Sequence, residues 1–149
     1  AYLGLNVLGI DINQKFCELI NARAKKNNLR ISAKIGTFEE IPTNDLFDGI
    51  LYYECLHHAT KLWEALEASF IKLKKGGKLI LAGEPINNIW KNWGLRTDAL
   101  SMYCIGKHGW FESGWSMEFL EYCIKKVGYS SINKYCYDGN IGWIVIAEK

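Results

Sequence analysis

The sequence has no long apolar run, no CxxC pair and very few prolines. No stretch approaches the roughly 18 apolar residues of a membrane span, and no signal peptide opens the chain, so we expect a cytoplasmic protein without a membrane span. The five cysteines are odd in number, which indicates reduced thiols rather than a disulfide framework. With only two prolines, no repeat and no Pro/Gly/Ser linker, nothing in the sequence marks a domain boundary.

The charges are nearly balanced. Eighteen basic and sixteen acidic residues leave a formal net charge of +2, which argues against a surface built to attract nucleic acid, so no nucleic-acid partner is expected. A length of 149 residues with 49% hydrophobic residues is typical of one soluble globular domain. We therefore predict a single domain over residues 1–149.

Apolar runs alternate with longer amphipathic stretches, which is the pattern of βαβ units with a mostly parallel sheet. The expected strands are residues 6–12, 31–35, 47–53 and 78–82, and the expected helices are residues 13–28, 60–75 and 116–127. Gly76 and Gly77 are expected to end the second helix. Residues 131–137 and 141–148 are expected to form an antiparallel hairpin, because only a three-residue turn joins them. Residues 83–114 show no clear period and are expected to be an irregular insertion with short helices.

Four motifs follow one another along the chain: GIDIN (9–13), GTFEEIP (36–42), FDGILYYECLHHA (47–59) and LKKGGKLILAGEP (73–85). Together they resemble class I S-adenosylmethionine-dependent methyltransferases of the type 11/12-like group. The resemblance implies an α/β fold, a Rossmann-like three-layer sandwich whose mostly parallel sheet ends in a C-terminal antiparallel hairpin. It also implies a transferase that uses S-adenosylmethionine as its cofactor.

The resemblance further implies a cofactor-binding set. Asp11 takes the place of the family acid that binds the ribose hydroxyls, and a carboxylate just past the carboxyl end of a strand can do so. The alternative is an acid that only favours the start of the following helix. The loop at residues 36–38 lies against the adenine, although Phe38 could equally fill the core. The predicted cofactor-binding residues are Asp11, Ile12, Gly36, Thr37, Phe38, Tyr52 and Tyr53.

The predicted catalytic residues are Glu54, His57 and His58, which follow the strand at residues 47–53. Glu54 and His58 are four residues apart, so a helical turn would place them on one face, with His57 pointing elsewhere. Either histidine could act as a general base. The Glu/His pair could instead hold a divalent metal, but two ligands are thin support, so no metal is predicted. A third role for His58 is to cap or pack the following helix.

The insertion at residues 83–114 is rich in aromatic rings. In the fold implied by the resemblance it lies over the acceptor side, so we expect it to form a lid and to select the substrate. Flat apolar walls suit a lipid-linked, aromatic or sugar acceptor, although the rings could also form a small core of their own. Glu84 and His108 are the polar candidates there. The predicted substrate residues are Trp90, Trp93, Tyr103, His108 and Trp110.

One family feature is missing from the sequence. The glycine-rich loop that holds the methionine part of the cofactor normally precedes the ribose acid by roughly 20 residues, which is upstream of Ala1. We therefore expect the natural protein to have upstream residues that include this loop and the first strand. Without that strand, residues 6–12 and 47–53 would each have an unpaired edge or would pair with each other.

Three functions are compatible with these patterns. The first is a methyltransferase that acts on an oxygen, nitrogen or carbon of a small-molecule, lipid-linked or saccharide acceptor. The second is a catalytically inactive methyltransferase-like binding or scaffold module, for which the missing loop is the best argument. The third, a nucleotide-dependent oxidoreductase, is disfavoured by the terminal hairpin and by residues 47–59. The sequence leaves the oligomeric state open, a homodimer included.

Overall fold

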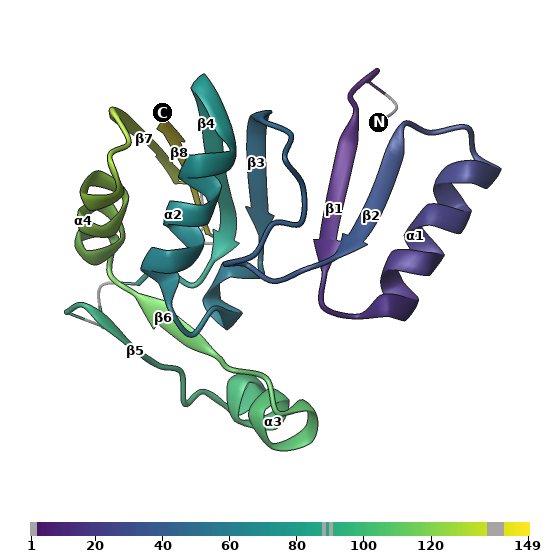
Figure 1. Ribbon diagram of the computed structural model, residues 1–149. Coiled ribbons are helices and arrows are strands. Elements are labelled where there is room, and N and C mark those ends of the chain that lie inside the picture. The colour runs from purple at the N-terminus through teal and green to yellow at the C-terminus, as the bar shows by residue number, and fades with distance from the viewer. Residues whose placement is uncertain (1–2, 88, 90, 137–141) are drawn as a thin grey trace. The chain divides into compact units, whose positions relative to one another are not determined.

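The computed structural model describes residues 3–87, 89, 91–136 and 142–149 (Figure 1). The chain divides into two compact units, residues 1–44 and 45–149, and each is described by itself. The single-domain interpretation of residues 1–149 stays a prediction. Within the described residues, none of the helices combines the length and the apolar character that a membrane span requires.

The N-terminal unit is a strand, a helix and a second strand, as the sequence predicted. Its elements are β1 (Val7–Asp11), α1 (Gln14–Lys26) and β2 (Ile31–Ile35). The two strands are parallel. Helix α1 begins where the predicted cap, Asn13, accepts a hydrogen bond from the backbone N–H of Lys15 at 2.9 Å. Asn21 of α1 then fixes the helix to the strand, because its amide both donates to and accepts from the backbone of Ala33.

The C-terminal unit contains a four-stranded mixed sheet in the order β3-β4-β8-β7. Its elements are β3 (Phe47–Tyr53), the 3-10 turn η1 (Leu56–His58), α2 (Leu62–Lys72), β4 (Leu73–Glu84), β5 (Trp93–Leu95), α3 (Ala99–His108), β6 (Ser113–Trp115), α4 (Met117–Val127), β7 (Ser131–Cys136) and β8 (Trp143–Glu148). Strands β3 and β4 are parallel, whereas β8 is antiparallel to both β4 and β7. The predicted terminal hairpin is confirmed, and its turn at residues 138–140 lies outside the described residues.

Helices α2 and α4 pack side by side on one face of this sheet (Figure 1). The core between helices and sheet is aliphatic, and its fully buried members include Leu62, Leu66, Leu79, Leu120 and Ile124. Burying these side chains removes apolar surface from water, which is the main stabilising term of the unit.

Two predictions about the middle of the chain are wrong. The helix expected to run to residue 75 ends at Lys72, and the glycine pair lies inside β4. Gly76 has φ +76, and this left-handed residue lies where the β3–β4 register shifts between Phe47 and Gly49. Lys149 holds this bend, because its backbone N–H donates to Gly77 and its carbonyl accepts from Gly76.

The stretch expected to be irregular is also ordered. Strands β5 and β6 pair antiparallel, from Trp93 opposite Trp115 to Leu95 opposite Ser113. Helix α3 lies between them, and its cap is Asp98, whose carboxylate accepts from the backbone N–H and the hydroxyl of Ser101. Strands of three residues are too short to show a period, so the sequence pattern could not reveal them.

Strands β1 and β3 belong to different sheets. In the described part of the chain, β1 pairs with β2 alone and β3 pairs with β4 alone.

The glycine that ends α4 should matter for stability. Gly128 has φ +115, and a Cβ there would meet the Phe70 ring at 3.4 Å. We expect Gly128→Ala to lower the free energy of unfolding by about 1–2 kcal/mol, measured by urea denaturation, because an L side chain is strained in this conformation. The matched control is Gly106→Ala inside α3, where a Cβ would meet nothing within 4 Å. That change should be neutral or stabilising by roughly 0.5–1 kcal/mol. Equal losses in both variants would contradict this account.

Candidate active site at the ends of β3 and β4

The parallel strands β3 and β4 end at the same edge of the sheet, where the chain turns sharply. Glu54, directly after β3, has φ +47, and its backbone N–H donates to the carbonyl of Ala82 at 3.0 Å. Gly83 faces it from β4 with φ +71, and a Cβ on Gly83 would lie 2.6 Å from the Glu54 side chain. The close approach of these two residues therefore requires glycine at position 83.

Glu84 is 2% exposed and binds the turn that follows β3. Its carboxylate accepts hydrogen bonds from three consecutive backbone N–H groups, those of Cys55 (3.0 Å), Leu56 (2.9 Å) and His57 (3.1 Å). Hydrogen bonds to an ionised acceptor are stronger than neutral ones, and N–H groups at the start of a turn favour negative charge. Glu84 therefore fixes the backbone of the turn to the end of β4.

The same carboxylate orients the ring of His57. The Nδ1 atom of His57 lies 2.9 Å from Glu84 Oε2. A carboxylate only accepts, so this geometry assigns the proton to Nδ1. In the neutral ring Nε2 then keeps its lone pair. In enzymes that use histidine as a general base, a buried carboxylate often fixes the tautomer of the ring in this way.

A second carboxylate faces the two histidines. Glu112, 4% exposed, lies 3.6 Å from Nε2 of His57 and 3.7 Å from Nδ1 of His58. Arg96 balances its charge, with Nη1 at 3.5 Å from Glu112 Oε2. Arg96 in turn pairs with Asp98 at 3.1 Å. Burial of Asp98 tends to raise its pKa, but hydrogen bonds from Ser101 and the charge of Arg96 outweigh this, so the pKa is lowered and the carboxylate stays ionised.

Three consecutive residues, 111–113, hold the histidine pair. The carbonyl of Phe111 accepts from Nδ1 of His58 at 2.8 Å, and the hydroxyl of Ser113 donates to the carbonyl of His57 at 2.7 Å. Glu112, between these two residues in the chain, makes the ion pairs with His57 and His58. Since a carbonyl only accepts, His58 carries its proton on Nδ1 and presents Nε2 as its acceptor.

His57, His58 and Glu112 bring three potential metal donors within 4.8 Å of one another. Two imidazoles and a carboxylate are donors that suit a divalent metal such as zinc. However, the His58 nitrogen nearest Glu112 donates its proton to Phe111, and Arg96 already balances the charge of Glu112. These contacts link the cluster into a hydrogen-bonded and ion-paired network.

Cys55 adjoins the network but is not activated as a nucleophile. Burial, reinforced by the negative charge of Glu84, raises its pKa to about 11. The thiol is therefore neutral near pH 7.

The aromatic residues predicted to meet the substrate form a connected row. Trp110 contacts the ring of His58 edge-on at 5.5 Å and stacks on His108 at 4.7 Å, and His108 meets Tyr103 at 6.2 Å. Trp93 stacks on Phe111 instead. Trp110 and Tyr103 are about half exposed, with one face of Trp110 stacked on His108 and the Lys107 ammonium over the Tyr103 ring. Trp90 lies outside the described residues, and the substrate role of the others stays a prediction.

The predicted cofactor residues of the N-terminal unit cluster at the end of β1 and β2. Asp11 uses Oδ1 to accept from the Asn13 N–H at 2.7 Å. The N–H groups of Gly36 and Thr37 donate within the chain, to the carbonyls of Asp11 and Glu40. Close to them in the sequence, Phe38 is half-buried and the Ile12 side chain is exposed.

Tyr52 and Tyr53 lie in β3 and alternate in burial. Tyr52 is 7% exposed, and its hydroxyl shares a 2.8 Å hydrogen bond with Ser69 of α2. Tyr53 is 64% exposed. Strand geometry places consecutive side chains on opposite faces, so Tyr52 serves the core and Tyr53 is the more accessible of the two.

The expected pairing of Glu54 with His58 on one helical face is wrong. The turn η1 spans Leu56–His58 alone, and Glu54 precedes it in a left-handed conformation. The sequence reading also missed Glu112 and Arg96. A signal for Glu112 was present, because an acid surrounded by the aromatic and small residues of WFESGW is unusual unless the acid is paired.

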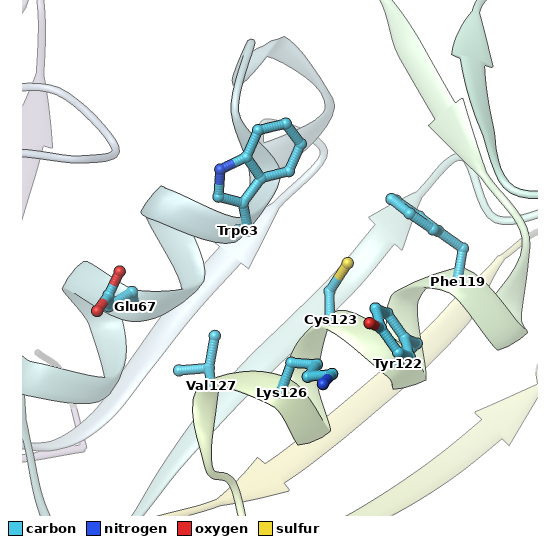
Figure 2. A pocket seen from close by; sticks show the side chains of 7 residues that line it. All are labelled: Trp63, Glu67, Phe119, Tyr122, Cys123, Lys126 and Val127. Atoms are coloured by element: carbon cyan, nitrogen blue, oxygen red, sulfur yellow. The ribbon is translucent and has the colours of Figure 1, made fainter.

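A separate groove of about 370 Å³ lies between α2 and α4 (Figure 2). Its lining consists of two residues of α2, Trp63 and Glu67, and five of α4: Phe119, Tyr122, Cys123, Lys126 and Val127. None of these residues belongs to the histidine network, so the groove is a distinct feature of the helix pair.

Comparison with known proteins identifies the fold and the family. The family model for the methyltransferase domain matches residues 1–81, more than half of the chain. The chain belongs to the methyltransferase domain family. This confirms the predicted resemblance to S-adenosylmethionine-dependent methyltransferases, the transferase class and the cofactor at the level of the family.

Individual relatives agree with this family. The chain is 35% identical over 80 residues to the ubiquinone biosynthesis O-methyltransferase of Pelagibacter ubique, a match that covers 54% of the chain and 33% of that protein. A SAM-dependent methyltransferase from Methanosarcina mazei superposes with a TM-score of 0.68 at 17% identity over 95% of the chain and 81% of its own length. PigF, solved with SAH, gives a TM-score of 0.72 at 17% identity over 99% of the chain and 44% of PigF.

Two conclusions follow from these comparisons. The predicted α/β, Rossmann-like class is confirmed, and the structural similarity at this identity concerns the fold alone. The chain spans about a third of the length of the curated relatives it matches.

The buried carboxylate of this methyltransferase domain should dominate its local stability. Glu84→Ala leaves three backbone N–H groups and one ring N–H without an acceptor, so we expect a loss of at least about 3 kcal/mol in the free energy of unfolding, measured by urea denaturation. Glu84→Gln should lose less, because it keeps one acceptor oxygen. The control is Glu148→Gln, which breaks an exposed pair with Lys78 and should change the free energy by less than about 0.5 kcal/mol. A loss in Glu84→Ala no larger than in this control would refute the assignment.

Proposed function

We propose that the protein transfers a methyl group from S-adenosylmethionine to a hydroxyl oxygen of a small-molecule acceptor, with His57 as the general base. The observation that carries the proposal is the 2.9 Å contact between His57 Nδ1 and the buried Glu84. Oxygen as the accepting atom is supported by the curated relatives, which are named ubiquinone biosynthesis O-methyltransferases. The half-exposed rings of Tyr103 and Trp110 suit an aromatic or lipid-linked acceptor.

The N-terminal unit has groups that fit the adenosine part of the cofactor. Oδ1 of Asp11 accepts the hydrogen bond from the Asn13 N–H, so Oδ2 remains to accept from the ribose hydroxyls. The exposed side chain of Ile12, next to Asp11 in the chain, offers apolar surface for the adenine, and the half-buried ring of Phe38 follows at the end of β2. When bound, S-adenosylmethionine supplies a methyl group on a positively charged sulfur.

The C-terminal unit has the groups that move the acceptor proton. Nε2 of His57 takes the proton of the hydroxyl, because Nδ1 already carries one and donates it to Glu84. The ring then holds a positive charge between Glu84 and Glu112, and both carboxylates stabilise it. Deprotonation makes the oxygen a better nucleophile, and positioning the acceptor adds to the rate.

Replacing the base should reduce turnover far more than binding. We expect His57→Asn to lower kcat by about 10²–10⁴-fold while the affinity for S-adenosylhomocysteine stays the same, because the change removes the group that takes the acceptor's proton. Labelled methyl transfer to a panel of phenols and small alcohols measures this. His58→Asn is the matched comparison and should lose less. A larger loss in His58→Asn would assign the base to His58 instead.

Removing the ribose acid should weaken cofactor binding. We expect Asp11→Ala to reduce the affinity for S-adenosylhomocysteine by about 10- to 100-fold in calorimetric titration of the full-length protein, because it removes hydrogen bonds to an ionised acceptor. The control is Asp48→Ala, which removes an exposed acid paired with Lys74 and should bind normally. Full affinity in Asp11→Ala would overturn the ribose assignment. Absence of binding by the unmodified protein would favour the inactive scaffold.

A further inference from the structure

Arg96 contacts Glu112 of the histidine network, and none of its described contacts is to His57. Its Nη1 lies 3.5 Å from Glu112 Oε2, and its backbone N–H donates to the Glu112 carbonyl at 2.9 Å. Its Nε donates to Asp98 at 3.1 Å. The guanidinium is therefore held at both ends, by the cap of α3 on one side and by Glu112 on the other.

We propose that Arg96 is a positioning residue that holds Glu112 against His57 and thereby sets the pH range in which His57 can act as a base. This inference rests on the proposed function, since it concerns the same histidine. It adds a residue from the segment between β5 and α3 to the machinery of proton transfer.

The charges that face His57 come from each element packed against its turn. Glu84 comes from strand β4, and Glu112 directly precedes strand β6. The turn itself contributes His58 and the neutral thiol of Cys55. Helix α2 packs on the turn, but its acids lie elsewhere: Glu64 pairs with Lys61, and Glu67 lines the outer groove.

Arg96 brings a permanent positive charge into this set. With it, two carboxylates face His57 and one is balanced by a guanidinium. Without it, both carboxylates act unbalanced on the ring, and a negative environment favours the protonated imidazole. A protonated His57 cannot accept the acceptor's proton, so the enzyme would need a higher pH to work.

The sign of the effect is therefore specific. In a plot of kcat against pH, the acid limb is the rise in rate as His57 loses its proton. Loss of Arg96 should move this limb to higher pH, because the protonated His57 ring is favoured. Loss of the Glu112 charge should move it to lower pH, because one of the two carboxylates is gone. A residue that only supported the local fold would lower the rate at every pH without moving the limb.

The test compares Arg96→Met, Arg96→Lys and Glu112→Gln with the unmodified full-length protein. We expect Arg96→Met to raise the midpoint of the acid limb of kcat by about one pH unit, while the plateau at higher pH is largely kept. Arg96→Lys should restore most of the original midpoint, and Glu112→Gln should lower it. The control Arg23→Met changes an exposed arginine of α1 and should leave the profile unchanged.

A second readout needs no methyl transfer. The ¹⁵N signals of the His57 ring, followed by NMR from pH 5 to 9 without substrate, should show the same opposite shifts in Arg96→Met and Glu112→Gln. If these shifts occur but no acceptor is methylated, the inference about Arg96 holds and the proposed function fails. If methyl transfer proceeds and neither the rate limb nor the ring signals move, the inference about Arg96 is overturned. If Arg96→Met does not fold, Arg96→Gln takes its place, with the same expected rise in the midpoint and the same result overturning the inference.

Discussion

The carboxylate of Glu84 takes a negative charge into the interior of the C-terminal unit. Such a charge is costly to bury unless its hydrogen-bonding positions are filled, and three backbone N–H groups and one ring N–H fill them. The backbone between β3 and α2 is shaped by this requirement. The orientation of His57 follows from it, and residues 111–113 then attach to a turn whose geometry is already fixed.

The elements that could be predicted from the sequence are those whose cause is local. Strand β2 and strand β3 were placed correctly because short apolar runs with polar or glycine ends define them. Helix α4 was placed because Ser116 and Gly128 cap a clear apolar stripe. The end of α2 was misplaced because the glycine bend inside β4 is held by Lys149, more than 70 residues along the chain. A contact of that separation leaves no mark in a local pattern.

In the candidate site too, the residues that could be predicted from the sequence are those whose position has a local cause. His57 was named because it stands at the carboxyl end of a predicted strand, whereas Glu84 was named only as a polar candidate of the aromatic-rich insertion. Glu112 and Arg96 could not be assigned, because their partners are set by how β5 and β6 pair, and three-residue strands carry no period. Asp11 was identified through the family resemblance, and its local geometry, with one oxygen used by Asn13, is compatible with both interpretations of that acid.

In helix α3, the side chains that stabilise the fold differ from those proposed to meet the acceptor. Ser101 is its one buried residue, and that serine also bonds to Asp98 at the cap, whereas Leu100, Met102 and Tyr103 are half exposed or more. The side chains of its outer surface therefore contribute little to the core. Their identity can drift during evolution at small cost in stability, provided that Asp98 and Ser101 are retained. The surface proposed to meet the acceptor is thus the part of the unit that selection can most readily adapt to a new substrate.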